Sequence, residues 1–347
     1  MTNNSSNNEI VVFYRRFNGS LQPLPWATVS TGGLGGSANA PIDPLGSQNA
    51  LIFDNDLRML FAVNAGDNTV TAFTTLTRDA VLKSVAHVPS GGTLPVSVAV
   101  SQNRLYVLNV GGTGTVATFE IAGNGELLLL DTLELGLDNP TCIPFDQAMA
   151  PGQIGVDALG RRLIITHGAG QELLSAPLDD DGIPTDSLIT TTTPGVVPFA
   201  FDVSRNGNIL LAEAGTSSVS SFSPSAVGQP FIVTSESIAT GQTATCWIVA
   251  TDRYAYVANT GANNISSFTH SRTGAVTLLE ANAASTSNAP IDMTLAGNNR
   301  YLYTLDAGSG SIFSFSIDAD TGQLHALEAR EGLPASAGLQ GIAAFDF

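Results

Sequence analysis

The chain has 347 residues and is 43% hydrophobic, which is enough for a substantial core and argues against a disordered protein. Its 30 acidic and 13 basic residues give a formal net charge of −17, so neither nucleic acid nor an anionic membrane surface is an expected partner. No apolar run approaches the ~20 residues that span a bilayer, so membrane insertion is not expected either.

The chain begins with a polar, Asn-rich stretch over residues 1–10, which has the character of neither a signal peptide nor a transit peptide. Residues 9–14 and 24–29 then predict two strands joined by a turn at Asn18-Gly19. Only 12% of the residues are charged, and Ser, Thr and Asn are abundant, as in many extracellular β-proteins. We therefore expect an extracellular or periplasmic protein whose signal peptide is absent from this sequence.

Six repeats follow, and each contains an apolar strand that ends just before a Gly-containing turn. We call the last residue of that strand the slot residue. The slot residues are Asn64, Asn109, His167, Glu213, Asn259 and Asp306. They are 45, 58, 46, 46 and 47 residues apart, and a period in the forties made of short strands is typical of a four-stranded propeller blade.

Each repeat has the same internal order. An opening strand is followed by a polar turn that usually contains Arg, then by the strand with the slot residue. The third strand alternates apolar and polar residues, as in 69–73 and 264–268, and a last strand such as 276–279 ends the unit. No long helical pattern interrupts these strands.

The two ends of the chain complete the ring. Residues 338–345 have the pattern of an opening strand, residues 1–3 that of a short second strand with Asn3 in a seventh slot, and residues 9–29 supply the third and fourth strands. The sequence therefore predicts an all-β fold with a single domain over residues 1–347. We expect a seven-bladed β-propeller of four-stranded antiparallel blades, closed by N- and C-terminal strands that share one blade, because an open ring would leave sheet edges unpaired.

The strand order places the slot residues and the first residues of the opening strands at one rim, and the Arg-containing turns at the other. We predict that the ligand-binding residues at this rim are Asn64, Asn109, Gln153, Phe199, Trp247, Asn259, Asp292 and Asp306. Two structural alternatives stay open. The Asn side chains can instead hold their own turns, and the two aromatic side chains can pack in the core below the rim.

His167 and Glu213 break the Asn pattern in two neighbouring repeats, and we predict that they are catalytic. Histidine transfers protons near neutral pH, and a carboxylate one blade away can orient it or share the proton transfer. The alternative is that both are polar rim residues that bond to the turns.

The sequence predicts no cofactor, and no Cys/His spacing suits zinc. One alternative is a Ca²⁺ or Mg²⁺ ion in the channel, held by oxygen atoms of Asp292, Asp306 and neighbouring slot residues. Cys142 and Cys246 are expected as buried thiols or as a single disulfide.

The Leu105–Asn109 and Ala255–Asn259 strands, the 264–268 strand and the Thr273-Gly274 turn resemble the lactonase-like, YVTN-type seven-bladed propellers. This group includes 6-phosphogluconolactonases and fungal carboxymuconate-lactonizing enzymes, and the resemblance covers the whole chain. For the latter enzymes it implies a His, a Glu and arginines around the channel. His167 and Glu213 match the first two, whereas no Arg falls at the predicted rim.

An acidic rim without arginines repels anionic substrates. We therefore expect a lactonase-type enzyme that hydrolyses or forms the lactone of a neutral or weakly charged small molecule. The alternative is a non-catalytic extracellular binding propeller that uses the loops 32–47 and 137–152.

Overall fold

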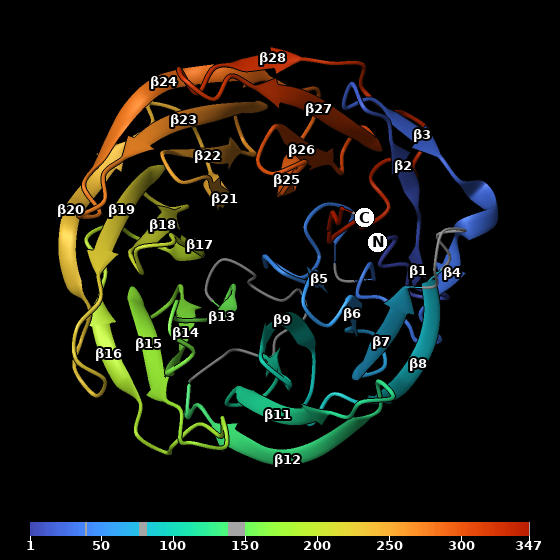
Figure 1. Cartoon of the computed structure of the whole chain (residues 1–347), viewed down its shortest axis with the longest axis vertical. Helices are drawn as coiled ribbons and strands as arrows, with labels where there is room; N and C mark the ends of the chain where they lie inside the picture. The colour runs from blue at the N-terminus through green and yellow to red at the C-terminus, as the bar shows by residue number, and fades with distance from the viewer. Residues whose placement is uncertain (39, 76–81, 138–149, 347) are drawn as a thin grey trace.

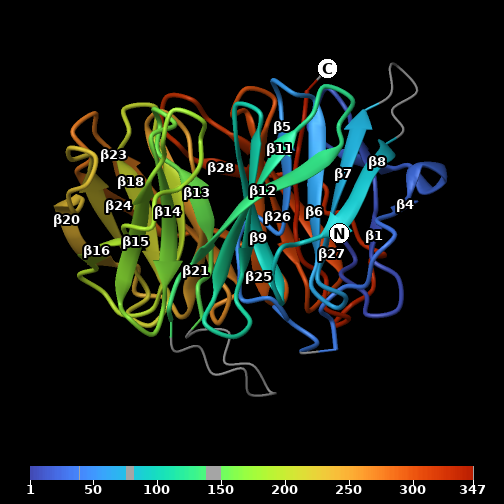
Figure 2. The same cartoon turned by 90° about the horizontal axis from the view of Figure 1, so that it is seen from below.

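The structure is a computed structural model that describes residues 1–38, 40–75, 82–137 and 150–346. Most of its strands form six four-stranded antiparallel sheets around a central axis (Figure 1). In each sheet the strands follow chain order from the axis to the outside, and Figure 2 shows them running between the two rims of the ring. The predicted all-β propeller with four-stranded antiparallel blades is confirmed.

The bounds of the six blades are as follows. The first two blades contain β5 (Leu51–Asp54), β6 (Met59–Asn64), β7 (Thr69–Thr75), β8 (Leu82–Pro89), and β9 (Pro95–Ser101), β10 (Arg104–Asn109), β11 (Thr115–Ile121), β12 (Leu127–Glu134). The next two contain β13 (Ile154–Val156), β14 (Arg162–His167), β15 (Glu172–Pro177), β16 (Ile189–Thr192), and β17 (Pro198–Val203), β18 (Ile209–Glu213), β19 (Ser218–Ser223), β20 (Ile232–Ala239). The last two contain β21 (Thr245–Ala250), β22 (Tyr254–Asn259), β23 (Asn264–His270), β24 (Val276–Ser285), and β25 (Pro290–Ala296), β26 (Tyr301–Asp306), β27 (Ser311–Ile317), β28 (Leu324–Ala326).

Burial explains the apolar patterns of the strands. The second strand of a blade lies between two neighbouring blades, so every residue of β6 and of β26 is buried. Such a strand has a continuous apolar run rather than an alternating one. The fourth strands face solvent on the outside, and β8 and β20 accordingly carry several exposed residues.

The predicted slot is confirmed as a structural position. The six slot residues are the last residues of β6, β10, β14, β18, β22 and β26. Each pairs across the hairpin with the first residue of the third strand, as in Asn64↔Thr69 and His167↔Glu172.

The terminal residues lie between the sixth and the first blade (Figure 1). Their strands are shorter than predicted: β1 (Glu9–Ile10) pairs with β4 (Val29–Ser30), β2 (Phe13–Arg15) pairs with β3 (Leu21–Pro23), and a 3-10 helix, η1 (Pro25–Ala27), interrupts the outer strand. The α-amino group of Met1 donates to the carbonyl oxygen of Gly341 at 2.8 Å, and the Thr2 N–H donates to that of Glu9 at 2.8 Å.

Residues 338–345, expected as an opening strand, form no assigned strand. The physical reason is that only Met1–Asn3 lies between this segment and the N-terminal hairpin, so most of its length has no neighbouring strand with which to pair. Among the described residues, no helix has the length and hydropathy needed to cross a membrane.

Candidate functional site

Two glutamines from the opening strands fill the axis at the slot rim. Gln48 reaches across the channel from the first blade to the fifth, where its amide donates to the Ile248 carbonyl at 3.0 Å and accepts the Ile248 N–H at 3.1 Å. Gln153 makes the same two bonds with Phe201, at 3.0 and 2.7 Å. Both side chains are buried, and each bonds to another blade through its amide nitrogen and its amide oxygen, so they act as cross-links between blades at this level of the channel.

Residues 43–47, which directly precede Gln48, bond to Trp247 and Gln340. Trp247 donates its indole N–H to the Ser47 carbonyl at 3.0 Å, and Gln340 donates to the same oxygen at 2.9 Å and to Asp43 at 2.9 Å. Trp247 and Phe199 are buried in edge-to-face contact, with ring centroids 4.9 Å apart. These two predicted ligand-binding residues therefore lie together, away from solvent.

The slot asparagines are buried, and each donates hydrogen bonds to residues around its own strand. Asn64 donates to Thr69 and Thr71 at 3.0 and 2.9 Å, and Asn259 donates in the same way to Asn264 and Ser266, both at 2.8 Å. In the second blade, Asn109 instead donates to the carbonyl oxygen of Ser90 at 3.1 Å. These contacts favour the structural alternative for the asparagines, since each amide ties the second strand to its surroundings.

Glu213 has the contacts of a structural carboxylate. It is fully buried, and one oxygen accepts the Gly195 N–H and the Ser220 hydroxyl, both at 2.8 Å. The other oxygen accepts hydroxyls from Ser218, at 2.7 Å, and from Ser237. A Cβ on Gly195 would lie 2.2 Å from this carboxylate, so glycine is needed for the close approach. No hydrogen bond joins Glu213 to His167 within the described residues.

The carboxylate beside His167 is Glu172, which sequence reasoning missed. Nδ1 of His167 lies 2.8 Å from Oε1 of Glu172, while Nε2 is buried and has no partner among the described residues. The His167 side chain is 9% exposed and that of Glu172 is 19% exposed. A Cβ on Gly170 would lie 2.4 Å from Glu172 and 2.6 Å from His167, so this turn is built around the pair.

The strand register could have revealed Glu172. It occupies the position opposite the slot residue, where the other five blades have Thr69, Thr115, Ser218, Asn264 and Ser311. Only the blade with a histidine slot therefore has an acid across from it. Ala169 and Gly170 in the intervening turn are exposed, so the pair lies directly below the surface.

Asp292 and Asp306 are buried, and no bond joins them. Asp306 accepts the N–H groups of Ser287 and Asn288 at 2.8 and 2.9 Å, and Asp292 accepts that of Met293 at 3.0 Å. Within the described part of the chain, the other oxygen of each carboxylate is buried and has no direct hydrogen bond. Burial raises the pKa of Asp292 to about 7 and that of Asp306 to about 6. In the described part of the chain, no group of three or more His, Cys, Asp or Glu residues is placed to hold a metal ion.

A cavity of about 280 Å³ lies on the channel side of the inner strands, and sequence reasoning did not predict it. It extends from Asn49 and Gln153 to the far ends of the opening strands, at Asp54 and Val203. Burial raises the pKa of Asp202, which also lines it, to about 6. Its lining residues include no Lys or Arg.

The arginines near the far rim contact neighbouring blades. The Arg162 guanidinium lies 3.9 Å from the Phe231 ring centroid, and Arg104 donates to the Asp181 carbonyl at 2.8 Å.

Cys246 is a buried free thiol, and burial raises its pKa. Cys142 lies outside the described residues, as does most of the predicted binding loop 137–152.

The sequence model of the family described as "Lactonase, 7-bladed beta-propeller" matches residues 31–337. The chain belongs to this family. Among sequences of curated proteins, none matches the chain.

Solved structures of other proteins share the fold of this lactonase-family chain. The periplasmic gluconolactonase PpgL of Pseudomonas aeruginosa is 17% identical, with a TM-score of 0.74 over 95% of this chain and 97% of that one. A candidate 6-phosphogluconolactonase of Bacteroides fragilis is 16% identical, with a TM-score of 0.73 over 94% and 95%. Virginiamycin B lyase of Staphylococcus aureus is 14% identical, with a TM-score of 0.58 over 83% and 85%. The propeller thus hosts more than one chemistry.

Proposed function

We propose that this protein is a lactonase-type enzyme that hydrolyses or forms the lactone of a neutral or weakly charged small molecule, with His167 as its general acid or base. The observation that carries the proposal is the His167–Glu172 pair. It combines an imidazole with one bonded nitrogen, one unpartnered nitrogen and a carboxylate that fixes the ring.

The geometry suits proton transfer at Nε2. When Glu172 accepts the Nδ1–H, Nε2 carries the lone pair and can take a proton from water as the oxygen attacks the lactone carbonyl carbon. The ring C–O bond then breaks, and the same proton passes from Nε2 to the departing alkoxide. In the lactonizing direction the steps run in reverse. Glu172 acts as a positioning residue, because its carboxylate bonds to the imidazole.

The expected substrate charge follows from the residues near the slot rim. Glu172, Glu213 and Asp306 end or begin strands there, while Arg104 and Arg162 bond to neighbouring blades at the other side. An anionic sugar phosphate or tricarboxylate would meet repulsion without a compensating guanidinium. A neutral lactone would not.

The other predicted site residues have supporting roles in this proposal. Asn64, Asn109, Asn259 and Gln153 would shape the rim as bonded scaffold, and Phe199 with Trp247 would form its floor. Asp292 and Asp306, whose side chains are buried, would shape the same rim from below. The catalytic role predicted for Glu213 stays a prediction, although its hydrogen bonds favour a structural role.

We also propose that the N-terminal hairpin, Met1–Asn3 and residues 338–346 together make a seventh, incomplete blade. Support comes from the bonds that join Met1 and Asn3 to Gly341 and Gly338, and from the seven-bladed description of the family. The periplasmic gluconolactonase neighbour supports an exported protein.

A non-catalytic binding propeller is the second candidate, and the bonded, buried slot rim is the observation that favours it. In that case the loops 32–47 and 137–152 would contact a partner, and His167 would be dispensable.

The test measures ring opening of a panel of neutral aldonolactones, for example by proton release in weakly buffered solution. His167→Ala should lower kcat/KM at least about a hundredfold, because general acid–base catalysis contributes about 10²–10⁴. Glu213→Gln, which can keep its serine contacts, should stay within a few-fold of the wild type if it is structural. Unchanged turnover by a folded His167→Ala protein would sink the catalytic proposal and leave the binding propeller.

A further inference from the structure

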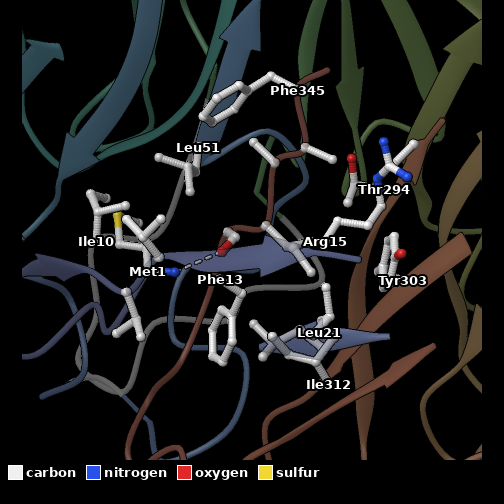
Figure 3. A pocket seen from close by; sticks show the side chains of 18 of the residues that line it. Met1, Ile10, Phe13, Arg15, Leu21, Leu51, Thr294, Tyr303, Ile312 and Phe345 are labelled. Carbon is white, nitrogen blue, oxygen red and sulfur yellow. Dashed lines mark hydrogen bonds between the residues drawn. The ribbon is translucent and has the colours of Figure 1, made fainter. Parts of the chain in front are cut away.

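Two cavities of the described structure differ in character. One, of about 320 Å³, lies between the first and sixth blades, where mainly apolar side chains such as Leu21, Leu51 and Ile312 line it (Figure 3). The other is the channel cavity of about 280 Å³, whose walls are the inner strands β5, β9, β13 and β17. His167 is not among the residues that line the channel cavity. What binds there is therefore a separate question from the proposed catalytic site.

The channel cavity is walled by open strand edges. Each of its four strands lies at the end of its sheet and pairs with a neighbouring strand on one side only. The Ala50 carbonyl bonds to β6, so the alternation of an antiparallel ladder turns the backbone of Phe53 toward the channel. The Val98 N–H bonds to Asn49 of the neighbouring blade at 2.9 Å, so Val100, two residues further on, also faces away from its own blade. The walls therefore offer backbone N–H donors and carbonyl acceptors.

The closed end of the channel cavity contains a polar side chain. Asn49 lines the cavity directly after the Gln48 cross-link and is half-buried. Its backbone has φ of 66°, a left-handed conformation that asparagine adopts more readily than most residues. Its side-chain amide forms no hydrogen bond with another residue in the described ranges. Asn49 can therefore both donate to and accept from a bound molecule.

The acids that line the channel cavity disfavour a charged occupant. The two oxygens of Asp202 accept the N–H groups of Val203 and Ala250, both at 2.7 Å. One oxygen of Asp54 accepts the Leu57 N–H at 2.8 Å. Because the lining includes no Lys or Arg, these carboxylates would repel an anion. Three of their four oxygens already accept N–H groups, so they also make a poor ligand set for a metal ion.

The dimensions of the cavity favour an elongated occupant. It extends from Asn49 to Asp54, which is at most about 17 Å of extended chain at about 3.4 Å per residue. A volume of about 280 Å³ spread along such a length is narrow. Walls that mix donors and acceptors suit hydroxyl groups, since each hydroxyl both donates and accepts. An unbranched polyol has a hydroxyl on every carbon and matches both the shape and the chemistry.

We propose that the channel cavity binds an unbranched, neutral polyol of sugar size, which enters from the far rim beside Asp54. The turn residues Asn55 and Asp56 that follow Asp54 are exposed, so this end of the cavity lies at the surface. The innermost hydroxyl bonds to the Asn49 amide, and those along the chain bond to the open edges of β5 and β9. The outermost hydroxyl donates to the free oxygen of Asp54.

The test titrates the whole chain with the six-carbon polyol sorbitol in calorimetry at neutral pH. We expect saturable one-to-one binding that raises Tm. The matched control ligand is hexanediol, which has the same carbon chain but hydroxyls only at its two ends. It should bind at least about tenfold more weakly, because the hydrogen bonds along the walls are lost. Gluconate, the same chain with a carboxylate at one end, should also bind at least about tenfold more weakly than sorbitol.

Three variants locate the bound polyol. Asn49→Gly keeps the left-handed backbone but removes the amide, so it should weaken sorbitol binding at least about fivefold. Its matched control is Asn298→Gly, at an exposed left-handed position outside the cavity, which should bind sorbitol as the wild type does. Asp54→Asn can keep its bond to Leu57 and should weaken binding severalfold, which provides a second test if Asn49→Gly does not fold.

His167→Ala separates this proposal from the catalytic one, because it should leave sorbitol binding unchanged whether or not it affects lactone hydrolysis. Absent sorbitol binding to the folded wild type would overturn the proposal. Equal binding of sorbitol and hexanediol, or tighter binding of gluconate, would also do so. Undiminished binding to folded Asn49→Gly and Asp54→Asn proteins, or loss of binding in a folded His167→Ala protein, would place the polyol elsewhere and equally contradict it.

Discussion

At the residue scale, the slot residues of the six repeats differ in what their side chains bond. Asn64 and Asn259 bond to the next strand, and Glu213 does the same through serines. His167 is different because its imidazole is bonded at Nδ1 to Glu172, while Nε2 has no hydrogen-bond partner among the described residues. The break in the Asn pattern was readable from the sequence. The partner Glu172 was not proposed, since it becomes visible only when residues are paired across the hairpin.

Gly170→Ala tests whether the turn holds the pair in place. The added Cβ would lie 2.4 Å from Glu172 and 2.6 Å from His167, so the imidazole must shift. We expect kcat/KM for lactone hydrolysis to fall about tenfold or more, because small displacements of catalytic groups are costly. Gly123→Ala is the matched control, since no atom lies within 4 Å of its Cβ. Equal activity of both variants would contradict the assigned geometry.

Asp292→Asn tests the buried acids of the channel. Burial raises the pKa of Asp292 from 3.8 to about 7, so the folded state binds its proton more tightly than the unfolded state does. The stability from this group is therefore present below pH 4 and is lost as the pH rises through 7. Between pH 4 and 7, the Tm of the variant should therefore fall less than the Tm of the wild type. Asn also suits the backbone here, with φ of 48°.

The exposed Asp180→Asn should leave the pH profile of Tm unchanged. The Met1 α-amino group works in the opposite direction, because burial lowers its pKa from 8.0 to about 5 and its contribution grows with pH. A steeper decline in the Asp292→Asn protein would contradict the assignment.

At the element scale, the strands could be predicted from the sequence, but the glutamine bonds that join the inner strands across the channel could not. The six blades could be predicted from the repeat period and from two strand patterns. The third strands alternate apolar and polar residues, whereas the second strands, buried on both faces, have a continuous apolar run. Gln153 was predicted as a ligand-binding residue of the rim. In the structure its amide, like that of Gln48, bonds to the inner strand of another blade, a long-range contact that no local pattern encodes.

Gln48→Ala tests this cross-link. The change leaves the buried N–H and carbonyl of Ile248 without their partner, and each unsatisfied group costs about 1–3 kcal/mol. We expect the free energy of unfolding to fall by about 2 kcal/mol or more in chemical denaturation. Gln323→Ala, at an exposed position, should change it by less than about 0.5 kcal/mol. A similar small effect for both would show that the channel glutamines do not hold the blades together.

At the scale of the whole molecule, the two ends of the chain meet and account for the least regular part of the ring. The sequence indicated shared terminal strands, but it did not indicate how few backbone pairs join them. Met1 bonds to the backbone of Gly341 and Gln340, and the Asn3 side chain bonds to the carbonyl oxygen of Gly338. The cavity beside them follows from the short second strand, since side chains of two blades have no strand between them.

Deletion of residues 338–347 tests the closure. It removes the bonds of Met1 to Gly341 and of Asn3 to Gly338, and the Gln340 bond to Ser47. We expect Tm to fall by several degrees and cooperativity to decrease, since apolar side chains of the first and sixth blades near this segment become more exposed to water. Substituting the exposed Phe17 by Ser should leave Tm nearly unchanged. An unaltered transition in the deleted protein would contradict a closing role for the terminus.

The most direct test of the central claim is kcat/KM for hydrolysis of a neutral lactone by the wild type and by Glu172→Gln, with Tm measured for both. If Glu172 orients His167, the amide should lower kcat/KM at least about tenfold, by favouring the wrong imidazole tautomer, while KM and Tm change little. A Glu172→Gln protein that hydrolyses the lactone as fast as the wild type would contradict the account.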